Sequence, residues 1–368
     1  MERVEKQRGD MVLIMLLVVM LGVGMALLFS GSYPFSMRAF KDPLYLLKRQ
    51  LIWAGIGGIV AFIISMTPVA MFRRWMPLIL IATLVALLLP FLPGVGMTIL
   101  GSRRWVNLFG QSFQPSELVK ICLILYLASY FANREEGGKI TMNALIPPFI
   151  VTCAFAGIIL MQNDYSTAIF VLIIGLSMFF IARVRILHFS LITLFTVPLG
   201  FLLLFTKEHR VQRLIAFFDL SSHSAGTGYQ IVNAKSALIT GGIWGKGLGR
   251  SVAKLGSLPM SYSDFIYAIV GEETGLLGAL FVLALFALLA WRGYRVALHS
   301  QDRFSYYVAF GITSAICLQA LLNMAVAIGL VPTTGVTLPF FSAGGSSLFA
   351  TLIMCGLLVN ISRRVTNV

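Results

Sequence analysis

Charged residues are scarce in this sequence, and their scarcity excludes an ordinary soluble protein. Only 11% of the 368 residues are Asp, Glu, Lys or Arg, whereas 58% are hydrophobic. A soluble domain is about 25% charged. The composition therefore predicts an integral membrane protein with many spans and without a separate soluble domain of ordinary size.

Cysteine and histidine are also few, at four residues each. The cysteines, Cys122, Cys153, Cys317 and Cys355, all fall within apolar stretches. We therefore interpret them as small core residues, which argues against a disulfide scaffold or a metal site built on thiolates. The histidines are scattered, and no spacing of His and Cys is typical of zinc ligands.

The sequence also lacks the signals of a secreted chain, a repeat protein and a P-loop enzyme. Its first apolar stretch, 11–31, is long enough to span a bilayer and has no small-residue cleavage site, so we expect no cleavable signal peptide. No heptads and no repeat of fixed period occur. The glycine-rich stretch 241–249 is not a Walker motif, because no Gly-Lys-Ser or Gly-Lys-Thr follows its glycines.

Long apolar runs are what the sequence does contain. Each is near the ~20 residues that a helix needs to cross a bilayer. We predict ten membrane helices, at residues 11–31, 48–67, 75–93, 115–133, 143–161, 165–183, 187–206, 265–291, 305–329 and 341–362. The expected fold is all-α: a single polytopic membrane domain over residues 1–368, with one long loop at about 207–264 between the seventh and eighth helices.

The basic residues indicate which side of the membrane holds the termini. An even number of spans puts both termini on one side with 14 of the 28 Lys and Arg, and 13 lie on the opposite side. The bias that marks the cytoplasmic side counts short loops, whereas the 207–264 loop contributes seven of those 13. We therefore predict cytoplasmic termini and an extracytoplasmic 207–264 loop. The outer side then carries basic residues that suit an anionic ligand.

One carboxylate stands where the long loop meets the eighth predicted helix. Asp264 ends a polar segment, and no Lys or Arg follows until Arg292. A carboxylate near lipid headgroups and partly out of bulk water tends to have a raised pKa, which suits a base acting on a lipid-linked substrate. The alternative is a purely structural N-cap, because Asp is a favoured residue at that position of a helix.

Charged residues within or beside other spans are further candidates, because such charges are costly in lipid. Glu117 and Lys120 are three residues apart on the fourth predicted helix, so they share a face, as a structural ion pair or as part of a substrate site. Just before them, Arg103, Arg104 and Trp105 lie at the outer headgroup level, as an interfacial anchor or as binding residues. The sequence leaves both alternatives open.

Polar and irregular stretches at other helix ends predict a cavity. Asp164 closes the polar segment 162–164, as a turn residue or as a group facing that cavity. Gln319 and Asn323 are four apart on the ninth helix, where they join helices or contact a ligand. Prolines and glycines in 331–347 break the backbone at membrane depth, which is tolerated only inside protein or along a cavity. We expect an outward-facing polar cavity between the fourth, eighth, ninth and tenth helices.

The long loop contains a further candidate site, Tyr229–Gly249, which includes the glycine-rich stretch 241–249. Its first part is consistent with a short interfacial helix, and its glycines indicate tight turns. Lys246 and Arg250 beside these glycines suit a phosphate site built from backbone N–H groups. Ordinary turns at the membrane surface are the alternative.

Four segments, in this order, resemble the SEDS family (shape, elongation, division and sporulation), whose members include FtsW, RodA and SpoVE. They lie at 101–120, 228–251, 258–278 and 321–347, so the resemblance spans nearly the whole chain. It implies a peptidoglycan glycosyltransferase that polymerises lipid II at the outer face of the bacterial cytoplasmic membrane. It also implies a class B penicillin-binding protein as partner transpeptidase. Membrane lipids and other divisome or elongasome proteins are further expected partners, and nucleic acid is not.

The resemblance also implies a catalytic residue, because the family's essential aspartate falls on Asp264. The chain differs from the family at three motifs. It has PMSYSDF at 259–265 where the family commonly has PEAHTDF, QND at 162–164 for QPD, and SAGGSS at 342–347 for SYGGSS. The aspartate is kept, so activity is still expected, whereas contacts made by the family's Glu, Tyr and Pro are not carried over.

The predicted reaction is glycosyl transfer with inversion. Asp264 takes the proton of the acceptor sugar hydroxyl, and polyprenyl pyrophosphate leaves. The charge of that leaving group needs cations, and the candidates, alone or with a divalent ion (Mg²⁺ or Mn²⁺), are Arg103, Arg104, Lys120, Lys246 and Arg250. The predicted substrate-binding residues are Arg103, Arg104, Trp105, Glu117, Lys120, Asp164, Lys246, Arg250, Ser263, Gln319, Asn323, Ser342 and Ser346.

Two other functions are alternatives. Broken helices and intramembrane charges are also typical of transporters, so a lipid II flippase is one, although no matched pair of broken segments occurs in two halves. A non-catalytic scaffold of a division complex is the other. The stretch Val331–Phe341 and the chain length favour division or sporulation over elongation.

Overall fold

The computed structural model describes residues 10–99, 101–108, 110–136, 142–182, 184–202, 205, 207–218, 227–256 and 258–365. Within this part of the chain, seven helices are long and apolar enough to cross a membrane, by length and composition. They are α1 (Met11–Phe40), α2 (Tyr45–Met66), α5 (Ser116–Glu136), α6 (Ile146–Met161, directly preceded by the short helix η2, Met142–Leu145), α11 (Ile266–Leu298), α12 (Arg303–Ala327) and α13 (Gly345–Ser362).

Three shorter apolar helices complete the set of ten. They are α4 (Met76–Leu88, followed by the short helix η1, Leu89–Phe91), α7 (Tyr165–Ile181) and α8 (Ile186–Leu202). Each of the ten helices overlaps one predicted apolar run, which confirms the prediction of a mostly helical polytopic membrane protein. A further short helix, α3 (Val69–Arg74), joins α2 to α4.

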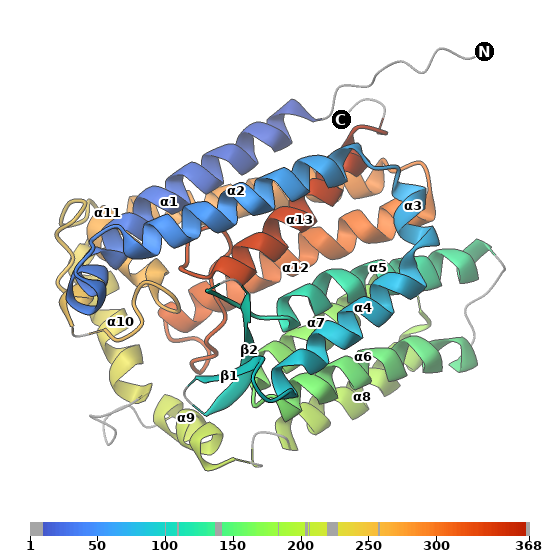
Figure 1. The fold of residues 1–368 in the computed structure, drawn as a ribbon, viewed down its shortest axis with the longest axis horizontal. Coiled ribbons are helices and arrows are strands. Elements are labelled where there is room, and N and C mark those ends of the chain that lie inside the picture. Colours follow the sequence, from blue (N-terminus) through green and yellow to red (C-terminus); the bar gives the residue numbers. More distant parts are fainter. Residues whose placement is uncertain are drawn as a thin grey trace.

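The helices that carry the polar candidates lie in the middle of the bundle. Figure 1 shows α12 and α13 between α1 and α2 on one side and the group α4 to α8 on the other. Most residues of α5, α12 and α13 are buried, whereas α2 exposes apolar side chains such as Ile59. Small residues allow α2 and α13 to approach each other closely. A Cβ on Gly57 of α2 would lie 2.8 Å from the side chain of Leu352 on α13.

A three-stranded antiparallel sheet lies between α4 and α5 and was not predicted. Its strands are β1 (Gly96–Ile99), β2 (Ser102–Leu108) and β3 (Gln111–Phe113), in the order β1-β2-β3. Gly101 and Gly110 sit in the two turns with φ of +76° and +80°, which glycine adopts without strain. The strands are too short and too polar to show a clear period, so the all-α expectation omitted them.

The described residues of the connection predicted at 207–264 are largely folded. It contains α9 (Glu208–Phe218) and α10 (Thr227–Gly241), then glycine-rich turns and the short helix η4 (Ala253–Leu255). The helix α10 confirms the short helix predicted within Tyr229–Gly249. Both α9 and α10 lie at the end of the bundle away from the two chain termini (Figure 1).

Two breaks in regular structure shape that same end. α11 is interrupted at Gly275, where φ is +70° and ψ is −168°, so the single helix predicted at 265–291 is two helices in sequence. Between α12 and α13, residues 328–344 form no helix or strand, which confirms the break predicted in 331–347 and starts the last helix at Gly345 instead of 341.

Candidate active site

Asp264 occupies the last turn before α11. Its backbone N–H donates to Met260 O at 3.1 Å, and Met260 itself has a φ of +55°. The N-cap position of α11 belongs to Phe265, and no side chain caps this helix. The N-cap alternative for Asp264 is therefore wrong. Its carboxylate instead accepts a hydrogen bond from Ser263 Oγ at 2.7 Å.

The surroundings of Asp264 set its protonation. The residue is half-buried, and burial raises the pKa of its carboxyl above the ordinary value. The Ser263 hydrogen bond and the positive charges of Arg104 and Arg213 lower this pKa, but burial prevails. Burial and the charge of Asp264 together raise the pKa of the Tyr262 hydroxyl. The site thus holds a carboxylate that accepts a proton more readily than an exposed one.

α12 and the irregular 328–344 segment hold the main chain around Asp264. Asn323 Nδ2 donates to Asp264 O at 2.9 Å and to Val336 O at 2.8 Å. Ser342 Oγ donates to Ser263 O at 2.5 Å. Asn323 and Ser342 are buried, and irregular backbone at membrane depth needs such partners for its polar groups. Both side chains therefore support the backbone of the site.

The Glu117–Lys120 pair predicted from its spacing is confirmed. The two side chains form a buried ion pair on α5, with Lys120 Nζ 2.7 Å from Glu117 Oε2. Lys120 Nζ also donates to Gln319 Oε1 at 2.8 Å, and Gln319 Nε2 donates to Thr337 O at 3.0 Å. These residues form one network that joins α5, α12 and the 328–344 segment, which in turn supports Asp264.

Arg104 and Asp164 form a second charged link. The distance between Arg104 Nη1 and Asp164 Oδ1 is 3.2 Å. Asp164 is buried and is the N-cap of α7, where it accepts from Thr167 N at 3.3 Å, and it also accepts from Gln114 Nε2 at 2.7 Å. The turn predicted at 162–164 is therefore confirmed, and Asp164 itself is the N-cap of the helix that follows it. The Arg104 guanidinium also lies 5.8 Å from the centre of the Trp105 ring.

The glycine-rich turns bind α11 instead of forming an open phosphate site. The backbone N–H groups of Lys246 and Gly247 donate to Glu272 O and Glu273 O, both at 3.0 Å. Lys246 Nζ pairs with Glu272 Oε1 at 2.6 Å, and Arg250 is exposed. Two N–H groups and one ammonium are thus already used within the protein.

The remaining predicted binding residues differ in their access. Arg103 is exposed on β2. Ser346, at the start of α13, is buried and accepts a hydrogen bond from Gln114 N at 2.9 Å. Arg103 is therefore placed where a ligand outside the bundle can reach it, whereas Ser346 holds the residue that follows β3 to α13.

Arg213 on α9 is a charged neighbour of Asp264 that the sequence analysis did not select. Its guanidinium and the Asp264 carboxylate interact electrostatically, and burial lowers the pKa of Arg213. The sequence did contain a signal, because Arg210 and Arg213 are three apart among apolar residues, as on one face of an amphipathic helix. Which helix that face meets depends on long-range packing.

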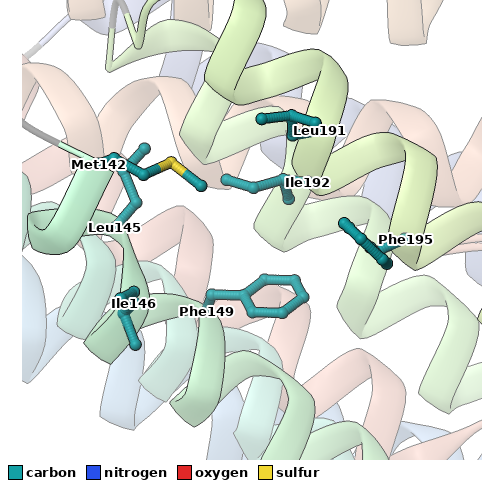
Figure 2. Close-up of a pocket in the computed structure, with 7 residues that line it drawn as sticks. All are labelled: Met142, Leu145, Ile146, Phe149, Leu191, Ile192 and Phe195. Atoms are coloured by element: carbon teal, nitrogen blue, oxygen red, sulfur yellow. The ribbon is translucent and has the colours of Figure 1, made fainter.

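Two cavities lie among the described residues away from these charged groups. One, of about 480 Å³, is lined by Ala70, Met71, Arg74 and Trp75. The other, of about 160 Å³, is entirely apolar and lies between η2, α6 and α8 (Figure 2). Neither is lined by a carboxylate, so neither suits acid–base chemistry. The described part of the chain also contains no group of three His, Cys, Asp or Glu that would hold a metal.

The family model FTSW_RODA_SPOVE, described as cell cycle protein, matches residues 10–367. The chain belongs to this family. It is 37% identical over 365 residues to the probable peptidoglycan glycosyltransferase FtsW of Geobacter sp. (strain M18), covering 99% of each chain. It is 36% identical over 361 residues to the stage V sporulation protein E of Bacillus subtilis (strain 168), covering 98% of each. The resemblance inferred from four segments is confirmed.

Solved structures share the fold over nearly its whole length. One chain, from a structure described as structural coordination of polymerization and crosslinking by a peptidoglycan synthase complex, gives a TM-score of 0.77 at 27% identity, covering 96% of this chain and 98% of that one. The rod shape determining protein RodA of Thermus thermophilus gives a TM-score of 0.67 at 27% identity, covering 98% of each chain.

Proposed function

We propose that the chain is a peptidoglycan glycosyltransferase that polymerises lipid II. The observation that carries the proposal is Asp264, a half-buried carboxylate of raised pKa that faces the charges of Arg104 and Arg213 beside a membrane helix. Its relatives bear the name of probable peptidoglycan glycosyltransferases, which supports this substrate class. The family description, cell cycle protein, and the name of the Bacillus subtilis relative, stage V sporulation protein E, support a role in division or sporulation.

Asp264 is the general base of the proposed reaction. The acceptor sugar hydroxyl gives its proton to the carboxylate, and its oxygen attacks the anomeric carbon of the donor. The bond from that carbon to the pyrophosphate oxygen breaks, and polyprenyl pyrophosphate leaves with the electron pair. Attack opposite the leaving group inverts the anomeric centre. One carboxylate suffices, because pyrophosphate needs little protonation to leave.

Cations near Asp264 stabilise the charge that develops on the pyrophosphate. Arg104 and Arg213 both interact electrostatically with Asp264, and Arg104 is also held by Asp164 at 3.2 Å. Arg103 is exposed on the same strand as Arg104. Lys120 and Lys246 are held by Glu117 and Glu272, so they contribute by fixing neighbouring elements. No step of this proposal is assigned to Mg²⁺ or Mn²⁺.

The proposed setting is the bacterial cytoplasmic membrane, with both termini in the cytoplasm and the Asp264 site outside. The short-loop charge bias supports this orientation. A class B penicillin-binding protein is the proposed partner, because a chain of similar fold belongs to a peptidoglycan synthase complex.

Polymerisation of lipid II by the purified protein, with and without its transpeptidase partner, tests the proposal. Glycan strands formed in either case support it. Movement of lipid II across a bilayer without polymer would favour the flippase alternative, and neither activity would favour the scaffold.

A further inference from the structure

The helix that follows Asp264 is bent into two parts. Its first part, Ile266–Thr274, ends at Gly275, and its second part continues to Leu298. Gly275 lies against the glycine-rich turns so closely that a Cβ there would be 2.3 Å from Ile243 O. In return, Leu276 N donates to Gly242 O at 2.9 Å. The bend is thus built by two segments together.

The bend lies far along α1 from the pair of Asp10 and Arg292. Ser30 on α1 is 20 residues beyond Asp10, which pairs with Arg292 of α11 at 3.4 Å near the chain termini. At 1.5 Å per residue this separation is about 30 Å, which equals the thickness of a hydrocarbon core. Ser30 donates to Glu273 Oε2 at 2.6 Å. Glu273, two residues before Gly275, therefore lies about one hydrocarbon thickness along α1 from the Asp10–Arg292 pair.

Three groups from three elements meet at this point, and we call them the Ser30–Lys254–Glu273 latch. Lys254 Nζ is 2.5 Å from Glu273 Oε1 and 3.2 Å from Ser30 O. The side chains of Lys254 and Glu273 are only 4% and 1% exposed. The latch therefore ties α1, η4 and the first part of α11 together through a buried ion pair and a partly buried serine.

A second buried carboxylate beside the latch is also fully occupied. Glu272 accepts from Lys246 Nζ at 2.6 Å, from Ser251 Oγ at 2.5 Å and from Ala253 N at 3.1 Å. Charges satisfied in this way are poor candidates for binding a substrate. Buried ion pairs are also a weak source of stability, because well-packed apolar residues are often as good. We therefore look for a role of these buried ion pairs other than substrate binding or stability.

We propose that the latch positions Asp264, an inference that rests on the proposed function. Ile266–Thr274 is a short rigid helix whose first residue is two positions after Asp264. Asn323 and Ser342 hold the Asp264 end, and the latch holds the other end. With both ends fixed, the carboxylate keeps one position relative to α1 and α12. Misplacement by about 1 Å can cost about 100-fold in rate.

Lys254→Met tests the latch, with Lys48→Met as its matched control. Lys48 pairs with Asp42 at 2.8 Å, but its side chain is 59% exposed, so this pair ties nothing buried together. We expect Lys254→Met to lower kcat for lipid II polymerisation by about tenfold or more with little change in KM. We also expect faster amide hydrogen exchange in the 258–266 segment. Lys48→Met should leave both unchanged.

Ser30→Ala is the second variant, because it keeps the ion pair and the bond from Lys254 Nζ to Ser30 O, and removes the hydroxyl that binds Glu273 and Gly249 N. It should show a smaller exchange increase in 258–266 and a smaller loss of kcat than Lys254→Met, because part of the link to α1 remains. Unchanged exchange and unchanged kcat in either folded variant would overturn the positioning role. A higher KM with an unchanged kcat would also overturn it. The exchange measurement needs no activity, so it reports on the latch even if Asp264 proves not to be the base.

Discussion

At the scale of single residues, the protonation of Asp264 depends on burial opposed by charge. The charged and titratable groups that face it are Arg104 from β2, Arg213 from α9 and Tyr262 from its own turn. Because the base acts ionised, we expect polymerisation to rise with pH through a pKa above the ordinary ~3.9 of Asp. Arg213→Gln removes a positive charge, so it should raise that pKa further and move the acid limb to higher pH. Rates measured across pH check this, and a limb that moves to lower pH would refute it.

The Glu117–Lys120 pair makes a prediction about stability. Lys120→Met leaves Glu117 as an unpaired buried charge and also removes the donor to Gln319. Breaking one partner of a buried pair costs about 3–5 kcal/mol. The double variant Lys120→Met with Glu117→Gln should therefore be less destabilised than Lys120→Met alone. Thermal unfolding of the purified variants measures this, and simple addition of two independent losses would show that the residues are uncoupled.

Some of these residue contacts were predictable and others were not. The pair of Glu117 and Lys120 follows from helical spacing, because three residues apart means one face. The sequence left open whether Asp264 caps the following helix. A shift of one residue in the start of that helix decides this, and such a shift has no local signal. The proximity of Arg213 to Asp264 arises from packing between distant segments, which no local pattern encodes.

At the scale of elements, Gly275 makes the bend in α11. Its backbone conformation is nearly exclusive to glycine, and a Cβ would strike the backbone of Ile243. We expect Gly275→Ala to destabilise the protein by at least ~1–3 kcal/mol and to impair polymerisation. Gly58→Ala on α2 is the control, because nothing lies within 4 Å of its added Cβ and Ala favours helix. Thermal unfolding of both variants measures the difference. Equal unfolding temperatures for Gly275→Ala and Gly58→Ala would contradict the role of Gly275 in the bend.

The apolar runs predicted which helices exist because burial in lipid needs long uninterrupted hydrophobic segments. They did not predict the bend in α11 or the sheet at Gly96–Phe113. The bend needs the glycine-rich turns as its partner, since their carbonyls bind the N–H groups that the interrupted helix frees. The sheet depends on two glycine turns and on pairing between short polar strands. Both are tertiary features with weak local signals.

At the scale of the whole molecule, the structure places the α9 and α10 end opposite the chain termini (Figure 1). The charge bias of the short loops then predicts that the end with α9 and α10 is extracytoplasmic. A cysteine at exposed Lys41, between α1 and α2, should react with an impermeant thiol reagent in intact spheroplasts. A cysteine at exposed Gln301, between α11 and α12, should react only after lysis. The reverse pattern would invert the proposed orientation.

Asp264→Asn is the most direct test of the account, because Asn keeps the size of the side chain and removes the base. A raised pKa in the folded state means that Asp264 contributes stability at acidic pH that is lost as pH rises through that pKa. The neutral Asn should therefore unfold at the same or a higher temperature than the parent protein near pH 7. The measurement is lipid II polymerisation by the purified variant, with its unfolding temperature taken on the same sample. A general base contributes about 10²–10⁴-fold, so the account predicts near-complete loss of glycan strands at undiminished stability. Substantial polymerisation by a normally stable Asp264→Asn protein would contradict it.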